Sequence, residues 1–189
     1  MNSDQIIKAK MCLSTIQRAS RLLKINIPEI YFVNEIPSRT ELYSHDLKFI
    51  SEDLRDIGYT VEKIRFVSKE YVIHINTKIF DNEVQMLCHC YQTIRYAYQI
   101  DEVRKYRNGL PYHDSLWNLR MWDYCFSNAR NVKEISHSNS PSAADMMAFA
   151  YLMIRKYHHV NISFKNTDKK RFESAVDDIK INIGALRYI

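Results

Sequence analysis

A long helix expected between residues 82 and 100 is the feature that most restricts how this chain can fold. Apolar residues occupy most of the circumference of this helix: Val84, Met86, Leu87, Cys88, Cys90, Tyr91, Ile94 and Ala97. A helix that is apolar on nearly every side has to be surrounded by other parts of the chain, whereas a surface helix needs only one apolar stripe. We therefore expect the segment 82–100 to lie at the centre of the fold.

One polar stripe interrupts this apolar surface. Residues three and four positions apart share a helix face, and along this segment they are Gln85, His89, Gln92, Tyr96 and Gln99. Buried amides need hydrogen-bond partners or water, so a polar stripe on a central helix indicates side chains that line a cleft. The alternative is a stripe that faces bulk solvent.

The rest of the chain predicts more helices and a few short strands. Helices are expected over residues 3–24, 46–57, 115–128, 141–158 and 168–183, with capping residues such as Ser140 and Pro141 at their starts. Strands are expected at 31–33 and 160–164, and the alternating segments 60–67 and 70–75 predict a hairpin. The expected fold class is α+β, mainly α, with a small antiparallel sheet, and the 189 residues are expected to form one domain, 1–189.

Composition excludes several classes of protein. The chain has only three glycines and no glycine-rich nucleotide motif, and no apolar run approaches the length of a membrane span. The start of the chain lacks a secretory signal pattern, and the four cysteines follow no disulfide or metal-site spacing. We therefore expect a cytoplasmic protein that holds no cofactor, with free thiols and no contact with membranes.

Two segments resemble motifs of a known enzyme family. Residues 92–99 read Gln-Thr-Ile-Arg-Tyr-Ala-Tyr-Gln, and residues 141–150 read Pro-Ser-Ala-Ala-Asp-Met-Met-Ala-Phe-Ala. They resemble the helices His-Glu-x-Arg-His-Ala-x-Gln and Pro-x-Glu-x-Asp-Ala-x-x-Phe-Ala of the zincin-like metallopeptidases of the ImmA/IrrE type. The strand ending at Asn76, with Phe80 after it, and Trp122 on the helix between the motifs agree with this order. The resemblance implies a zincin-like core over residues 58–158, with helical additions at both ends.

The positions that carry the chemistry in that family are all changed. The resemblance places Gln92 and Tyr96 where the two zinc-binding imidazoles stand, Thr93 at the general-base glutamate and Ala143 at the third ligand. A hydrolytic zinc site needs three protein ligands, and neither a neutral amide nor a phenol is a good zinc ligand near neutral pH. The resemblance therefore implies a degenerate site that holds no metal and a chain that is not an enzyme.

Residues that the two motifs share with the family have a structural role by the same resemblance. Arg95 in the first motif and Asp145 in the second are expected to be scaffold residues, and a salt bridge between them would tie the two helices together. The alternative is that either side chain is solvated.

These observations predict a non-catalytic domain that binds a protein partner, through the cleft or through another surface. Active relatives occur in bacteria, phages and integrating elements and act on repressors or host regulators, so a degenerate copy from such an element is expected to bind without cutting. Two alternatives stay open. Basic residues on the first helix and near the end of the chain, which has a net charge of +5, suit a regulatory protein that binds nucleic acid. A metallopeptidase with a rearranged metal site would use His89 with a histidine from elsewhere.

Overall fold

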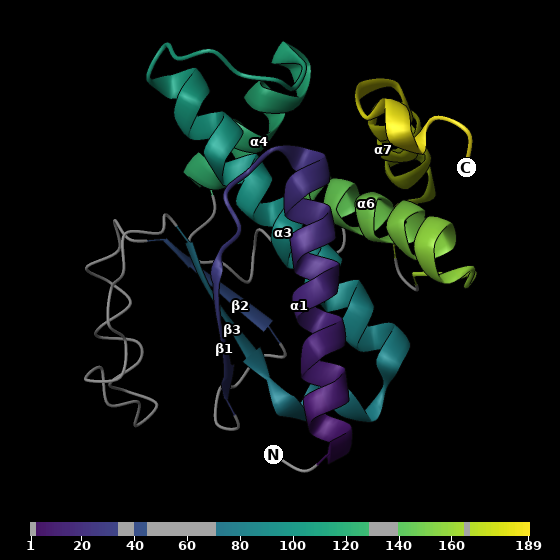
Figure 1. Cartoon of the computed structure of the whole chain (residues 1–189). Helices are drawn as coiled ribbons and strands as arrows, with labels where there is room; N and C mark the ends of the chain where they lie inside the picture. Colours follow the sequence, from purple (N-terminus) through teal and green to yellow (C-terminus); the bar gives the residue numbers. More distant parts are fainter. Residues whose placement is uncertain (1–2, 34–39, 45–70, 129–139, 165–166) are drawn as a thin grey trace. The chain divides into compact units, whose positions relative to one another are not determined.

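The computed structural model describes residues 3–33, 40–44, 71–128, 140–164 and 167–189 (Figure 1). The predicted helix at 46–57 and the first hairpin strand at 60–67 lie outside the described residues. The chain divides into two compact units, residues 1–93 and 94–189, and the boundary falls within the helix α3 (Glu83–Arg107). The single domain over the whole chain stays a prediction.

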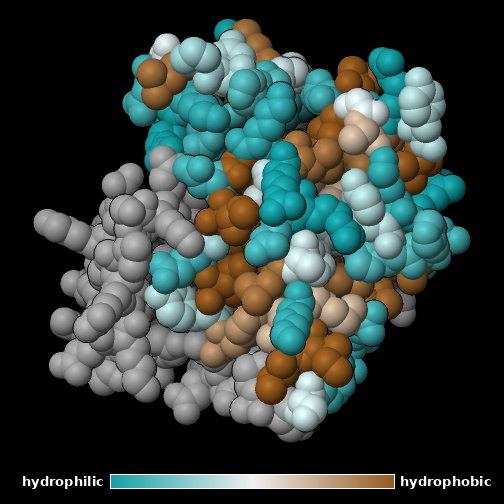
Figure 2. Space-filling view, in the orientation of Figure 1, coloured by the Kyte–Doolittle hydropathy of each residue, from teal (hydrophilic) through white to brown (hydrophobic). Residues whose placement is uncertain are grey.

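The N-terminal unit contains α1 (Ser3–Leu23), a small sheet, the short 3-10 helix η2 (Thr77–Asp81) and the beginning of α3. Helix α1 buries one apolar side, including Cys12, Ile16 and Ala19, and contacts η2. Figure 2 shows both hydrophilic and hydrophobic residues along the visible side of this helix. The helix predicted from the spacing of its apolar residues is therefore confirmed.

Three strands in the described part of the chain form a sheet: β1 (Glu29–Val33), β2 (Thr40–Ser44) and β3 (Tyr71–Asn76). Strand β3 lies in the middle, with β1 parallel to it on one side and β2 antiparallel on the other. The prediction of an antiparallel sheet is wrong for the β1–β3 pair, in which Ile30 lies beside Ile73. Alternation of apolar and polar residues identifies a strand but is the same for both directions of pairing, so the sequence pattern could not reveal this arrangement.

The C-terminal unit is helical. It contains the rest of α3, then α4 (Leu116–Asn128), α6 (Pro141–His158), α7 (Lys169–Asn182) and the short 3-10 helix η3 (Gly184–Leu186). Helix α6 contacts α4, α7 and η3, and it is buried along most of its length. None of the helices in the described residues is long and apolar enough to cross a membrane. The chain is thus mainly helical with a small sheet, as the sequence predicts.

Local signals explain where the helices start and end. The Ser140 hydroxyl accepts a hydrogen bond from the backbone N–H of Ala143 at 3.0 Å, and Pro141 occupies the first turn of α6. Helix α6 ends at His159, whose φ of 56° lies in the left-handed region that stops a helix. The residues that follow, 160–164, have irregular conformation, so the strand predicted there is wrong.

Helix α3 continues two turns beyond the predicted end near residue 100. Ion pairs one turn apart stabilise this extension: Asp101 pairs with Arg104 at 2.9 Å and with Lys105 at 2.7 Å. Gly109, with a φ of 64°, then ends the helix. The predicted end came too early because the pattern of apolar residues stops near Ile100, whereas ion pairs between charged residues stabilise the last turns. The burial of Leu87, Tyr91 and Ile94 confirms that the apolar sides of α3 are covered.

Candidate functional site

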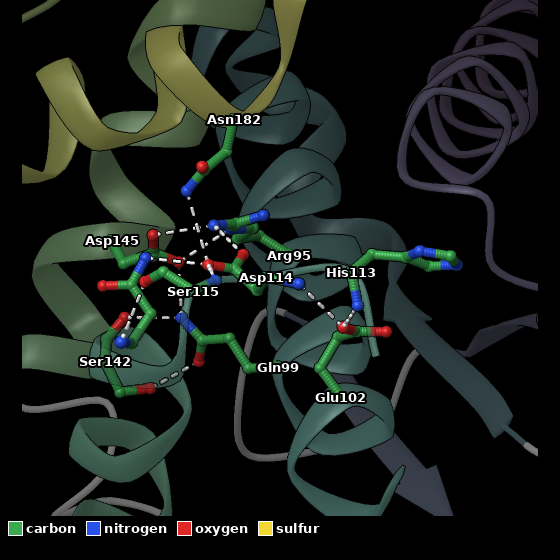
Figure 3. Close-up of polar contacts among 10 residues, drawn as sticks. Arg95, Gln99, Glu102, His113, Asp114, Ser115, Ser142, Asp145 and Asn182 are labelled. Atoms are coloured by element: carbon green, nitrogen blue, oxygen red, sulfur yellow. Dashed lines mark hydrogen bonds and ion pairs between the residues drawn. The ribbon is translucent and has the colours of Figure 1, made fainter. Parts of the chain in front are cut away.

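A buried ion pair joins the two segments that carry the motifs. Arg95 on α3 is 1% exposed and Asp145 on α6 is 3% exposed. The guanidinium binds the carboxylate with two nitrogens, Nε to Oδ2 at 2.7 Å and Nη2 to Oδ1 at 2.9 Å (Figure 3). A two-point contact of this kind fixes the relative orientation of both side chains and is stronger than a single ion pair. The salt bridge expected between these two residues is present, and neither side chain is solvated.

Gln99, one turn after Arg95, extends the contact. Its side-chain nitrogen donates to Asp145 Oδ2 at 2.6 Å and to the Ser142 backbone carbonyl at 3.1 Å, while the Ser142 hydroxyl donates back to Gln99 Oε1. Gln99 is fully buried. It therefore does not line an open cleft, as the stripe on the helix wheel suggested, because α6 packs over it and supplies its hydrogen-bond partners.

Asp114, in the connection between α3 and α4, is a second acid at the same place. Its carboxylate lies 3.5 Å from Arg95 Nη2 and accepts hydrogen bonds from the Asn118 side chain and the Ser115 backbone N–H, both at 2.8 Å. Asn182 at the end of α7 reaches the same carboxylate at 3.5 Å. We call the set Arg95, Gln99, Asp114, Ser142 and Asp145 the Arg95 network (Figure 3).

Glu102 holds the connection that carries Asp114. The Glu102 carboxylate accepts hydrogen bonds from the backbone N–H groups of His113 and Asp114, and it pairs with Lys105 at 2.9 Å. Glu102 is fully buried. The chain between α3 and α4 is thus tied to α3 by side chains on successive turns of that helix.

The surroundings of Arg95 within the network favour its protonated, positively charged form. Burial lowers the pKa of Arg95, but the carboxylates of Asp145 and Asp114 outweigh burial and raise this pKa above its usual value. The rings of Tyr98, Trp122 and Phe149 also face the guanidinium, with 4.6, 5.3 and 5.6 Å from its carbon to the ring centroids. Arg95 therefore stays protonated at any pH at which the protein is folded.

The network contains one cation and two carboxylates, and this excess of negative charge acts on a neighbour. The pKa of Asp178 on α7 is raised by partial burial and by the nearby charges of Asp145 and Asp114. Most polar groups of the network are engaged with one another, although Arg95 Nη1 is buried without a hydrogen-bond partner among the described residues. This arrangement suits a structural role.

The four positions that the resemblance assigns to the zinc site hold different chemistry. Thr93 is buried, and its hydroxyl donates to the His89 backbone carbonyl at 2.8 Å. The half-buried Tyr96 packs its ring against Phe126, with 5.9 Å between ring centroids, and burial raises the pKa of its phenol to about 12. Ala143 is buried in the first turn of α6, and Gln92 is half-buried on α3. These residues do not fit a zinc ion, since they supply no anionic or imidazole ligand near neutral pH.

Two other predicted cleft residues, Gln85 and His89, are half-buried on the first half of α3. This exposure suits a groove as well as a partly solvated helix face, so their role as cleft residues stays a prediction. Among the described residues, no group of three His, Cys, Asp or Glu side chains is placed to hold a metal ion.

Sequence reasoning found Arg95 and Asp145 but missed Asp114, Ser142 and Glu102. A serine after a helix-starting proline and an aspartate before a helix are typical capping residues, and each reads as a local signal. Ser115 does act in this local way, since its hydroxyl accepts from the Asn118 backbone N–H at 3.1 Å. The structure shows in addition that Asp114 contacts Arg95 and that Ser142 bonds to Gln99, both of them residues of α3.

Comparison of the chain with protein-family models, with curated proteins and with solved structures gave no match.

Proposed function

We propose that this chain is a zincin-like domain without catalytic activity, a pseudo-metallopeptidase that acts by binding another protein. The observation that carries the proposal is that the polar residues retained in the two motifs bond to one another. Arg95 and Gln99 of the first motif both bind Asp145 of the second. If both segments derive from the family that they resemble, this is the contact that would hold its two motif helices together.

The residues at the four positions of the degenerate zinc site also support the proposal. A threonine engaged with the backbone cannot take a proton from water, and a methyl group offers no electron pair to a metal. The Tyr96 phenol, with a pKa of about 12, is protonated near neutral pH and packs against a ring. The scaffold contacts are therefore intact where the groups needed for hydrolysis have been replaced.

A domain that keeps its framework without its reacting groups is suited to recognition. Active proteins of the family that the motifs resemble act on other proteins, so binding without cleavage is the simplest function for a degenerate copy. This step is an analogy of fold and motif, and it is tested through the geometry of the ancestral site.

The test rebuilds the zinc site by three substitutions, Gln92→His, Tyr96→His and Ala143→Glu. If the three positions still converge, the variant should bind about one equivalent of zinc, with zinc–nitrogen distances of about 2.0–2.1 Å. Isothermal titration calorimetry measures the stoichiometry, and X-ray absorption spectroscopy measures the distances. Ala143 is the third residue after Ser140, so a glutamate there completes a Ser-x-x-Glu capping box and is compatible with the helix.

Two controls make this test decisive. The single variant Ala143→Glu has the new carboxylate but no imidazole and should bind no zinc, and circular dichroism shows whether each variant is folded. A folded triple variant that binds no zinc means that the three positions do not meet, and the proposed ancestry is then withdrawn. One equivalent of tightly held zinc in the unmodified chain would contradict the proposal directly.

A further inference from the structure

Helix α4 has two unlike faces. Asn118, Leu119 and Trp122 are buried. At helical spacing on the opposite side stand Leu116, Trp117, Arg120 and Tyr124, all of them exposed. Trp117 is 75% exposed and Tyr124 is 71% exposed, although large aromatic side chains are usually found mostly buried. We call these four exposed residues the α4 face.

The composition of the α4 face differs from that of an ordinary solvated helix surface. A solvated face is normally rich in lysine, glutamate and other polar residues. Here two turns of helix present a tryptophan, a tyrosine, a leucine and an arginine. Tryptophan, tyrosine and arginine are the residue types that contribute most to binding energy at protein interfaces. The preceding connection adds two more exposed apolar side chains, Leu110 and Tyr112.

The charge on the face restricts its partner. Arg120 lies between Trp117 and Tyr124 along the helix. The acidic residue nearest to it in the sequence is Asp123, whose carboxylate accepts a hydrogen bond from Arg107 Nε at 2.6 Å. The α4 face is therefore apolar and positively charged. An apolar surface with an acidic group at the matching position is complementary to it.

Two other occupants fit this face less well. In a symmetric dimer through the α4 face, a two-fold axis near its centre would bring Arg120 close to Arg120 of the second copy, and like charges oppose such packing. Single-stranded nucleic acid stacks on aromatic rings but also needs a groove of several cations along its backbone. The α4 face has one arginine and also contains Leu116, whose aliphatic side chain suits apolar protein side chains better than bases.

We propose that the α4 face binds an amphipathic, acidic helix of a partner protein. This inference rests on the proposed function as a protein-binding module and names the surface that does the binding. The apolar side of the partner helix covers Trp117 and Tyr124, as two helices pack side by side within proteins, and one of its carboxylates pairs with Arg120.

The experiment selects peptides of about 18 residues, five turns of helix, from a random phage-displayed library on the immobilised full chain. The variant Trp117→Ala/Tyr124→Ala is kept out of the selection and is used only afterwards, to measure the binding of each selected peptide. The selected peptides should carry apolar residues at helical spacing together with aspartate or glutamate. Each should bind the unmodified chain and lose about thirtyfold in affinity for the double variant, the loss typical of an interface hot spot.

Charge reversal separates the acidic partner from other occupants. The variant Arg120→Glu should weaken the selected acidic peptides by about tenfold or more and strengthen their lysine-substituted twins. Arg155→Glu, at an exposed arginine on α6, is the matched control and should leave both affinities unchanged. Fluorescence supplies an independent reading, because Trp117 is exposed and Trp122 is fully buried. Bound peptide should protect the unmodified chain, but not Trp117→Phe, from acrylamide quenching.

The inference is overturned if the selection enriches no peptide, or if the enriched peptides lack acidic residues. It is also overturned if the peptides bind Arg120→Glu as well as they bind the unmodified chain. Stronger binding of a thymidine oligonucleotide than of any peptide at the α4 face would overturn it in favour of nucleic acid as the occupant. Peptides that bind equally well to all α4 variants would place the binding surface elsewhere and leave the protein-binding function standing. Failure of the zinc-site reconstruction would remove the ancestry without affecting the α4 result.

Discussion

A guanidinium buried as deeply as that of Arg95 has lost its water and depends on the groups that replace it. In the C-terminal unit these groups are the Asp145 and Asp114 carboxylates and three aromatic rings. Removing either member of the Arg95–Asp145 pair leaves the other charge buried without its main partner. The energetic consequence is larger than the net contribution of the intact pair, because the remaining charge keeps its full desolvation cost.

Arg95→Ala and Asp145→Ala should therefore each lower the free energy of unfolding by about 3–5 kcal/mol. Arg107→Ala is the matched control on the same helix, since Arg107 pairs with Asp123 at the surface and its loss should cost less than about 1 kcal/mol. Urea denaturation followed by circular dichroism measures all three values. The double variant Arg95→Ala/Asp145→Ala should cost less than the sum of the two single losses. Equal effects at Arg95 and Arg107 would show that the network contributes little.

Two half-buried residues, Cys88 and Tyr96, make stability depend on pH at the alkaline end. Burial raises the pKa of Cys88 from 9.0 to about 12 and that of Tyr96 from 10.0 to about 12. The unfolded chain loses these protons first, so the contribution of both groups is complete below about pH 9 and is lost as the pH rises toward 12. The free energy of unfolding should thus be level near pH 8 and fall from about pH 9 upward.

The double variant Cys88→Ala/Tyr96→Phe isolates this effect, because neither replacement titrates. Its free energy of unfolding should fall less steeply between about pH 9 and 11 than that of the unmodified chain. Urea denaturation in a series of buffers provides the comparison. Parallel curves for the two proteins would mean that these groups are not responsible for the alkaline loss.

At the scale of the elements, predictions succeed where the signal is local. The start of α6 is an example, because Ser140 and Pro141 are capping residues in any context. The end of α3 was misplaced because charged pairs at Asp101 continue the helix after the apolar pattern stops. The direction of β1 relative to β3 has no local signal, and the side-chain periodicity is the same for either pairing.

In the candidate site, too, some residues could be predicted from local sequence motifs and others could not. Arg95 and Asp145 were expected to pair because each is the charged residue of a recognisable motif, and the structure places them in contact. Gln99 was assigned to an open cleft, since a helix wheel gives the face of a residue but not what packs on it. The partners of Asp114 come from α3, α4 and α7, and no local pattern links these segments.

The two faces of α3 are predicted to differ in their sensitivity to mutation. Leu87 is buried in the N-terminal unit, so Leu87→Ala should lower the free energy of unfolding by about 2–5 kcal/mol. Gln92 is half-buried, and Gln92→Ala should cost less than about 1 kcal/mol. Thermal and urea unfolding of both variants measure the difference. If Gln92→Ala proves as destabilising as Leu87→Ala, the stripe belongs to a structural network and does not line a binding groove.

On the scale of the whole molecule, the buried polar residues and the exposed apolar residues differ in the role that we propose for them. The guanidinium of Arg95 and the amide of Gln99 are buried, and both bind the carboxylate of Asp145. The α4 face, in contrast, exposes two aromatic side chains, one leucine and one arginine. This distribution of side chains agrees with the proposed function of binding a partner protein.

The proposed function without catalysis also predicts how the unmodified chain behaves toward zinc and toward peptide substrates. After purification in the presence of zinc and mild chelation, it should contain no stoichiometric zinc and should cleave no peptide or protein substrate, because Gln92, Thr93, Tyr96 and Ala143 supply neither ligands nor a base. Elemental analysis and a general protease assay measure the two properties, with the reconstructed triple variant as the positive control for zinc. The rival is a rearranged site that uses His89. In that case the chain would hold one equivalent of zinc and lose it on His89→Ala. Zinc that stays bound in His89→Ala, or hydrolysis that depends on added zinc, would equally contradict a binding function without catalysis.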